Sequence, residues 1–374
     1  MQSSIEVLIG FLIFWGLLYF IVKLIKPKKV NIYPFLLIAK TGIKMDPISD
    51  KKKAYVISIL GWISLFISIG LMGYFYYIVF DLFISRYIIQ TSSSVSAGFV
   101  PLIPGVTIGL DQLTYFLLAI GIAVIVHELS HAIVARAEGI PIKDAGFFLL
   151  AFIPAAFVEP DENKIKSSSL RSRFKVYSAG VSVNLILGLI FLAIFLLITP
   201  KLFNGISIIN VVSNSPASLA GIKPGMTVLS VNNTKFLSLQ SFMTYLQGVG
   251  AESASTSVKL IFNVNYNGIV QNISIYKPIG VDHLGISVQQ SFRLSWLISL
   301  ISALYLINIG LALVNAAPLA IPLPGGNIQS DGGYIFVEAL GKIGKKASMA
   351  GITFEVFTLL IILSLLTFSP IRLP

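Results

Sequence analysis

Long apolar stretches separated by short polar segments dominate the hydropathy pattern of this chain. Six of them are long enough, or nearly long enough, to cross the hydrocarbon core of a bilayer, which takes about 20 residues of helix. We therefore predict a polytopic α-helical membrane protein with about six transmembrane helices. The predicted spans are residues 7–25, 54–80, 113–137, 176–198, 294–314 and 352–368.

Two further apolar segments are too short, or too rich in proline and glycine, to be spans. Residues 142–160 follow the third stretch, and residues 315–333 follow the fifth. Non-helical backbone at membrane depth is tolerated only where protein or a water-filled cavity surrounds it. We interpret residues 142–160 as a re-entrant or interfacial segment, and we expect residues 315–333 to lie beside the same part of the protein.

A segment of different composition separates the fourth and fifth stretches. It is rich in Val, Ile, Ser and Asn, its alternating runs at 257–264 and 269–276 predict strands, and residues 238–246 predict a helix. Its length of about 77 residues suits one small inserted domain. The predicted organisation is two N-terminal helices in 1–111, a first core half in 112–200, the inserted domain in 204–280, a second core half in 293–340, and a C-terminal helix in 341–374.

Composition and charge fit this picture. The chain of 374 residues is 55% hydrophobic and 11% charged, with a mean hydropathy of +0.87, whereas soluble domains carry about 25% charged residues. Nineteen of the 27 Lys and Arg residues fall in 23–53, 136–175 and 342–346, after the first, third and fifth stretches. The positive-inside rule places these segments in the cytosol, and the N-terminus and inserted domain outside it, in a protein of the cell membrane.

The net charge of +11 does not indicate nucleic acid, because most of it is explained by this distribution. The aromatic-basic repeats that stack on bases are absent from the chain. The lipid bilayer is the partner that the pattern predicts.

Two histidines and a glutamate lie inside the third apolar stretch, as His127, Glu128 and His131. Ionisable groups in hydrocarbon cost several kcal/mol unless they are paired or bound to a metal. Residues four apart share one face of a helix, so both imidazoles can reach one ion. The pattern is the H-E-x-x-H of zinc metalloproteases, in which the glutamate contacts a water on the ion. A chance match to so short a pattern is the alternative.

A catalytic zinc usually has three protein ligands, and this chain has no cysteine to supply one. Asp331 is the only acid between Asp282 and Glu338, and it follows the fifth span, near the same membrane face as His131. We predict Asp331 as the third ligand. The alternative role is an N-cap of a helix at 334–340.

These residues resemble the site-2 protease family of intramembrane zinc metalloproteases. The matching positions are His127, Glu128 and His131 of HExxH, Gly180 and Asn184 of the middle core helix, and Asn315, Pro318, Asp331 and Gly332 of the Asn-x-x-Pro to Asp-Gly motif. Residues 147–159 are similar to the family's membrane re-entrant β-loop, and residues 205–235 resemble its inserted PDZ domain. Two departures are Val181, where the family has Pro, and a longer stretch from Pro318 to Asp331.

The resemblance implies regulated intramembrane proteolysis. A Zn²⁺ ion held by His127, His131 and Asp331, with Glu128 as general base, would hydrolyse peptide bonds in or near transmembrane segments of membrane-protein substrates. Asn184 and Asn315 could donate to the oxyanion or hold the substrate, or they could make interhelical hydrogen bonds.

The role of the metal site and the role of the PDZ-like domain each leave alternatives open. The metal site could belong to a non-catalytic membrane scaffold or a metal transporter. The PDZ-like domain could capture a C-terminus, with its carboxylate-binding loop near residues 204–208, or act as a size filter, or be a passive spacer.

Overall fold

The computed structural model describes residues 2–89, 98–252, 256–280, 283–323, 326–371 and 373. The chain divides into two compact units, Leu192–Ser302 and a membrane unit that comprises Met1–Phe191 and Ala303–Leu373. Residues 253–255, inside the predicted inserted domain, lie outside the described part of the chain. Each unit is described by itself.

Five helices are long and apolar enough to cross a membrane, and they overlap five of the six predicted spans. The remaining predicted span lies on α1 (Gln2–Ile25), whose apolar part Ile9–Ile25 is shorter, so the count of six stays a prediction. The five helices are α2 (Lys51–Ile84, continued by one π-helical turn, η1, Ser85–Ile89), α3 (Leu113–Ala137), α5 (Leu170–Leu202), α8 (Ser295–Ala316) and α10 (Lys345–Ser364).

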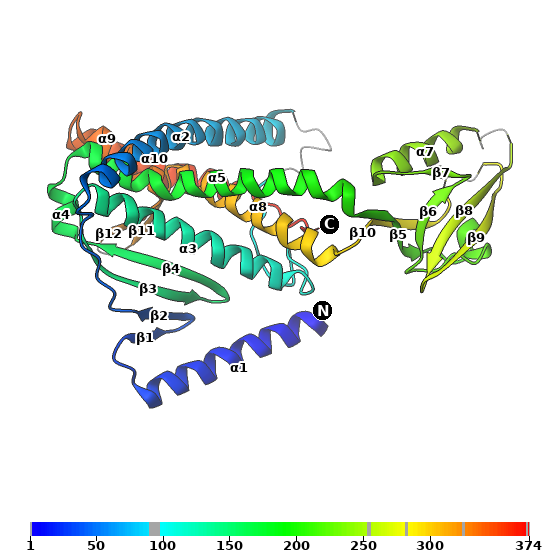
Figure 1. The fold of residues 1–374 in the computed structure, drawn as a ribbon, viewed down its shortest axis with the longest axis horizontal. Helices are drawn as coiled ribbons and strands as arrows, with labels where there is room; N and C mark the ends of the chain where they lie inside the picture. The colour runs from blue at the N-terminus through cyan, green and yellow to red at the C-terminus, as the bar shows by residue number, and fades with distance from the viewer. Residues whose placement is uncertain are drawn as a thin grey trace. The chain divides into compact units, whose positions relative to one another are not determined.

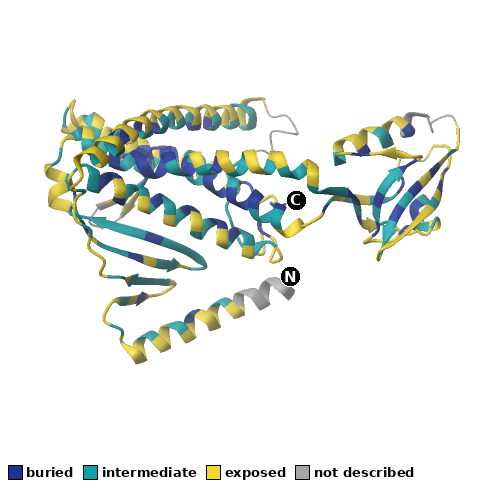
Figure 2. Ribbon diagram, in the orientation of Figure 1, coloured by how far each residue is buried: buried dark blue, intermediate teal, exposed yellow. Residues whose placement is uncertain are grey.

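α2 buries little of its surface against the protein. Only Gly61, Leu65, Ser68, Phe75 and Val79 are buried on it, and Figure 2 shows exposed and half-buried residues along the rest. α5 and α8 are in close contact at Gly188, where an added Cβ would lie 2.6 Å from Ile309 Cγ1. Apolar side chains that face outward suit helices whose solvent is lipid.

A four-stranded antiparallel sheet lies beside α3 (Figure 1). The segment predicted to be re-entrant is the hairpin β3–β4, and its depth in a membrane stays a prediction. Two strands from the N-terminal region, to which the sequence assigned no structure, extend the hairpin, because Leu36–Lys40 pair with Leu150–Gly146. The strands, in sheet order, are β1 (Val30–Tyr33), β2 (Leu36–Lys40), β3 (Ile142–Leu150) and β4 (Ile153–Pro160).

The N-terminal helix is attached to the tip of this sheet. Trp15, 4% exposed, donates its indole N–H to the carbonyl of Ala151 in the β3–β4 turn at 2.9 Å, and Phe35 of the β1–β2 turn stacks on Phe11. Short elements complete the membrane unit. The helix α4 (Glu162–Ser167) follows β4. Between α8 and α10 lie the hairpin of β11 (Ala320–Leu323) and β12 (Gly326–Gln329) and the helix α9 (Asp331–Gly341).

The second unit contains a six-stranded antiparallel sheet around an apolar core in which Phe242, Leu260 and Phe262 are fully buried. The predicted strands and helix are present, but the sheet continues past the predicted end at residue 280, because β10 pairs with β5. Its elements are β5 (Phe203–Val211), α6 (Pro216–Leu219), β6 (Thr227–Val231), β7 (Thr234–Lys235), α7 (Leu239–Glu252), β8 (Val258–Tyr266), β9 (Ile269–Lys277) and β10 (Ile286–Phe292).

Candidate metal centre

The two histidines of the motif lie on one face of α3 and converge. Their Nε2 atoms are 3.1 Å apart, and their side chains are 8% and 12% exposed. His131 Nδ1 lies 2.7 Å from the carbonyl of Val176 on α5. A carbonyl only accepts, so this contact places the proton on Nδ1 and leaves the Nε2 lone pair of His131 for a ligand.

Asp331 completes the group from the other half of the membrane unit. Its Oδ2 is 3.2 Å from Nε2 of His127 and 3.4 Å from Nε2 of His131. Asp331 is the first residue of α9, and Ser330 is the N-cap, its hydroxyl accepting from the N–H of Gly333. The alternative that Asp331 caps this helix is therefore wrong.

The carboxylate of Asp331 faces both imidazoles. Asp331 Oδ2 is buried and has no hydrogen-bond donor among the described residues. One carboxylate oxygen and two imidazole nitrogens that face a common point are the donor set of a three-ligand zinc site.

Glu128 lies beside the histidines and faces the sheet. Its Oε2 accepts a hydrogen bond from the N–H of Val158 on β4 at 3.1 Å. β4 is the last strand in the sheet order and packs along α3. His127, Glu128 and His131 each offer a ligand atom within 4.8 Å of the others, so this group could hold a metal ion.

A pocket of about 700 Å³ opens at these residues. It holds all four predicted metal-site residues and Asn315, whereas Asn184 is not among its lining residues. Residues that the sequence did not single out also line it, among them Tyr334, which lies one helical turn after Asp331 and so on the same face of α9. The lining includes His127, Glu128, His131, Val158, Glu162, Lys166, Arg173, Val176, Tyr177, Asn315, Gln329, Ser330, Asp331, Tyr334 and Glu338.

A polar network joins α5 to α9 at this pocket. Arg173 Nε donates to Glu338 Oε2 at 2.7 Å, and the Tyr177 hydroxyl donates to Glu338 Oε1 at 3.0 Å. The rings of Tyr177 and Tyr334 stack with centroids 5.1 Å apart. These contacts hold α9, and with it Asp331, against the helix that supports His131.

Asn184 is fully buried on α5, and neither atom of its amide has a hydrogen-bond partner among the described residues. An unsatisfied buried amide costs about 1–3 kcal/mol. The structure therefore assigns no interhelical hydrogen bond to Asn184, and its role stays a prediction.

Gly180 on α5 leaves room for the ring of His127. A Cβ at this position would lie 2.5 Å from His127 Nε2. We expect Gly180→Ala to push the imidazole aside and to weaken zinc binding about 10- to 100-fold, the usual loss when a ligand is misdirected. Competition titration of the purified protein with a chelator of known affinity measures this.

The matched control for Gly180→Ala is Gly121→Ala on α3. Gly121 has nothing within 4 Å of an added Cβ, so its substitution should leave zinc affinity unchanged. Equal zinc affinity in both variants would show that the ring of His127 does not need the space at Gly180.

Apolar helices that hold a convergent His-Glu-His group in a polar pocket define a class of protein, the membrane-embedded metalloproteases. A family model described as peptidase family M50 matches residues 115–365. The chain belongs to this family, the site-2 protease family, and is a metalloprotease. The alternative of a scaffold or transporter is not supported by this membership.

The chain is similar to two curated proteins, one of which is named as a site-2 protease homolog. The chain is 28% identical to an uncharacterized protein of Methanocaldococcus jannaschii over 333 residues, which cover 87% of this chain and 84% of that protein. It is 27% identical over 160 residues to the membrane-bound transcription factor site-2 protease homolog of Arabidopsis thaliana, covering 41% of this chain and 31% of the plant protein.

Proposed function

We propose that this protein hydrolyses peptide bonds in or near the transmembrane helices of membrane proteins, with a Zn²⁺ ion held by His127, His131 and Asp331. The observation that carries the proposal is the convergence of these three side chains from two halves of the chain, within 3.4 Å of one another. When bound, zinc would supply Lewis-acid chemistry, polarising the scissile carbonyl and lowering the pKa of a coordinated water from 15.7 towards about 7.

The roles of the chain's own residues follow from their positions. Glu128 is proposed as the general base, which takes a proton from water and passes it to the leaving nitrogen. The outer edge of β4 has no paired strand among the described residues, and the N–H of Val158 is bound there by Glu128. The rest of this edge is proposed to pair with the substrate, because a helix has all its carbonyls engaged and must unwind before it is cut. Asn315 lines the pocket and is proposed to donate to the developing oxyanion or hold the unwound strand, and Asn184 stays a weaker candidate for the same role.

The test uses the purified full chain in proteoliposomes with a reporter that has one transmembrane helix between two soluble tags. Cleavage should stop after dialysis against a chelator and return when Zn²⁺ is restored. Mass spectrometry of the products should place the cut within or next to the apolar helix. Cleavage that survives complete metal removal, or cuts confined to the soluble tags, would contradict the proposal.

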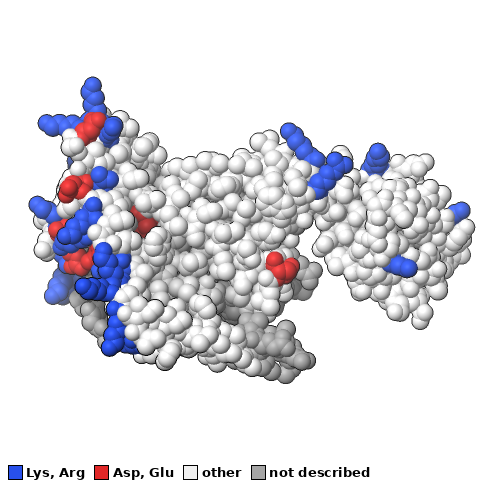
Figure 3. Space-filling model, turned by 60° about the horizontal axis from the view of Figure 1, so that its bottom comes forward, with Lys and Arg blue, Asp and Glu red and all other residues white. Residues whose placement is uncertain are grey.

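We propose that the end of the membrane unit that carries α4 and α9 faces the cytosol. Figure 3 shows lysines and arginines gathered there, and a long uncharged surface beside them. The second unit, between an outward and an inward span, would then lie outside the cytosol.

The absence of native cysteine gives a test of this orientation without background labelling. Ser167→Cys, in α4, should react with an impermeant thiol reagent only from the cytosolic side. Ser274→Cys, at an exposed position of β9, should react only from outside. Labelling of the two cysteines from the opposite sides would reverse the topology.

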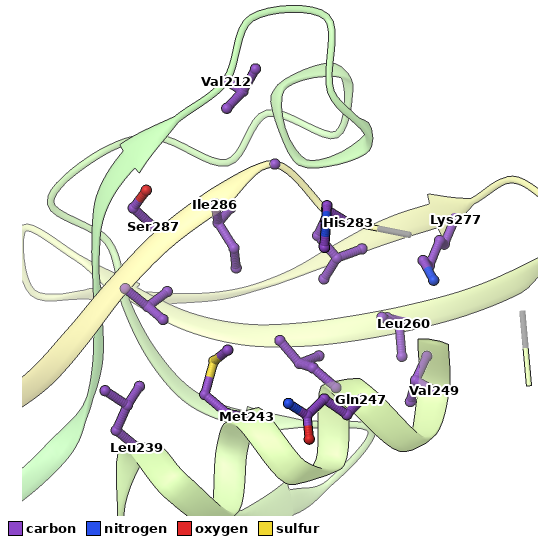
Figure 4. A pocket seen from close by; sticks show the side chains of 14 residues that line it. Val212, Leu239, Met243, Gln247, Val249, Leu260, Lys277, His283, Ile286 and Ser287 are labelled. Atoms are coloured by element: carbon purple, nitrogen blue, oxygen red, sulfur yellow. The ribbon is translucent and has the colours of Figure 1, made fainter. Parts of the chain in front are cut away.

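A groove of about 750 Å³ suggests a ligand for the second unit (Figure 4). It runs between α7 and β10, an edge strand of the sheet, with Lys277 and His283 among its lining residues. The sequence placed a carboxylate-binding loop near residues 204–208, and this is wrong because those residues belong to β5, which is paired on both edges. The apolar lining comprises Val212, Leu239, Met243, Leu246, Val249, Leu260, Leu284, Ile286 and Val288.

We propose that an extended C-terminal segment of a substrate adds to β10 in this groove, with an apolar last side chain in the lining and its carboxylate towards the two basic residues. A peptide ending in Val with a free carboxylate should bind the full chain about tenfold more tightly than its amidated form. Met243→Asp, which puts a charge among the apolar side chains, should abolish binding of both. Equal affinity for the free and amidated peptides would contradict recognition of the carboxylate.

A further inference from the structure

The longer stretch between Pro318 and Asp331, a departure from the family pattern, folds into the hairpin β11–β12. Its last residue, Gln329, lines the pocket with the metal-site residues. Gln329 Nε2 donates to Oε2 of Glu355 at 2.7 Å. Glu355 lies in the middle of α10 and is fully buried.

Glu355 also contacts the other side of the Asp331 turn. A Cβ on Gly333 would lie 2.7 Å from Glu355 Oε1, so this glycine makes room for the carboxylate. Glu355 Oε1 has no hydrogen-bond partner among the described residues. A buried acid in an apolar helix is costly, so its contacts with the residues two positions before and two positions after Asp331 indicate a functional position.

Glu355 Oε2 accepts from the Gln329 NH₂, and this contact determines which way the Gln329 amide faces. With the Gln329 NH₂ directed to Glu355, the carbonyl oxygen of the same amide is turned away from α10. Gln329 and Asp331 line the same pocket, so we expect this oxygen to face the pocket as an acceptor.

We propose that Gln329 binds substrate by accepting a hydrogen bond from a backbone N–H of the unwound strand near the scissile bond, and that Glu355 is a positioning residue that holds the Gln329 amide in this orientation. The ligand is the peptide backbone of an extended segment, and this recognition does not depend on the side chains of the segment. The proposal rests on the proposed proteolytic function of the same site.

The test compares Gln329→Leu, Glu355→Met and the double variant in the proteoliposome assay with the single-helix reporter. Gln329→Leu should raise KM about tenfold and leave kcat within about twofold, because the lost bond holds substrate in the ground state as well as in the transition state. Glu355→Met should raise KM by a smaller factor. In the Gln329→Leu background, Glu355→Met should have no further effect on KM.

A swapped pair provides the rescue. In Gln329→Glu with Glu355→Gln, the new amide on α10 donates to one carboxylate oxygen and leaves the other as the acceptor towards the pocket. KM should return to within about threefold of the original value, whereas Glu355→Gln alone lets the two amides pair in either orientation and should stay impaired. Thr358→Val, which removes a different polar contact of α10, is the matched control and should match the original protein.

Zinc content, measured on every variant, separates a structural role from a positioning role. Loss of zinc in Glu355→Met, or an added KM effect in the Gln329→Leu background, would overturn the proposed action of Glu355 through Gln329. Unchanged KM in Gln329→Leu would overturn the substrate contact. Failure of the unmodified protein to cleave the reporter in a zinc-dependent way would instead overturn the proposed function.

Discussion

Replacing Glu128 by Gln is expected to lower the rate of reporter cleavage by about 10²–10⁴-fold, the contribution of a positioned general base, and to leave zinc at one per chain. The amide keeps a carbonyl oxygen that can accept the N–H of Val158, so the contact between α3 and β4 survives. What the amide cannot do is take a proton from water. The measurement is initial cleavage rate together with zinc stoichiometry by mass spectrometry.

Ser130→Ala is the matched control for Glu128→Gln. Ser130 lies in the same motif, but its hydroxyl donates to the carbonyl of His127 within the helix, so its loss should change the rate by less than about threefold. Zinc loss in Glu128→Gln would show that Glu128 is a ligand, as its place in the His-Glu-His group permits. A variant that keeps zinc and more than a tenth of the activity would remove Glu128 from its proposed role.

Replacing Asp331 by Ala is expected to reduce bound zinc below one per chain and to remove cleavage with it. The loss of affinity should exceed the roughly 100-fold that follows from the loss of an outer-shell partner, because a ligand itself is removed. His127→Ala should behave in the same way. Zinc content after chelator-buffered dialysis measures both.

Glu162→Gln tests whether an exposed acid at the pocket, and not Asp331, is the third ligand. Glu162 lines the pocket but is exposed and lies 3.1 Å from Lys166, so its substitution should leave zinc unchanged. Glu159, an acid on β4, forms an ion pair with Lys40 at 2.7 Å. Full zinc in Asp331→Ala, with loss of zinc in Glu162→Gln, would transfer the third ligand position to Glu162.

The sequence alone predicted the features that depend on residues close together in the chain. The helix at Leu113–Ala137 has the predicted bounds, because an apolar run of that length has its backbone satisfied internally only as a helix. The approach of His127 to His131 follows from their spacing of four on that helix. Asp331 could be singled out because acids are so rare near the membrane segments.

Other features depend on contacts between residues far apart in the chain, for which no periodicity gives a signal. The pairing of β2 with β3 joins residues more than 100 positions apart and makes the N-terminal region part of the sheet beside the metal centre. The ring of His127 needs the space at Gly180, and Ser330 rather than Asp331 caps α9. The contact of Gln329 with Glu355 and the groove between α7 and β10 exist only once these elements pack, because strand pairing and burial are properties of the folded chain.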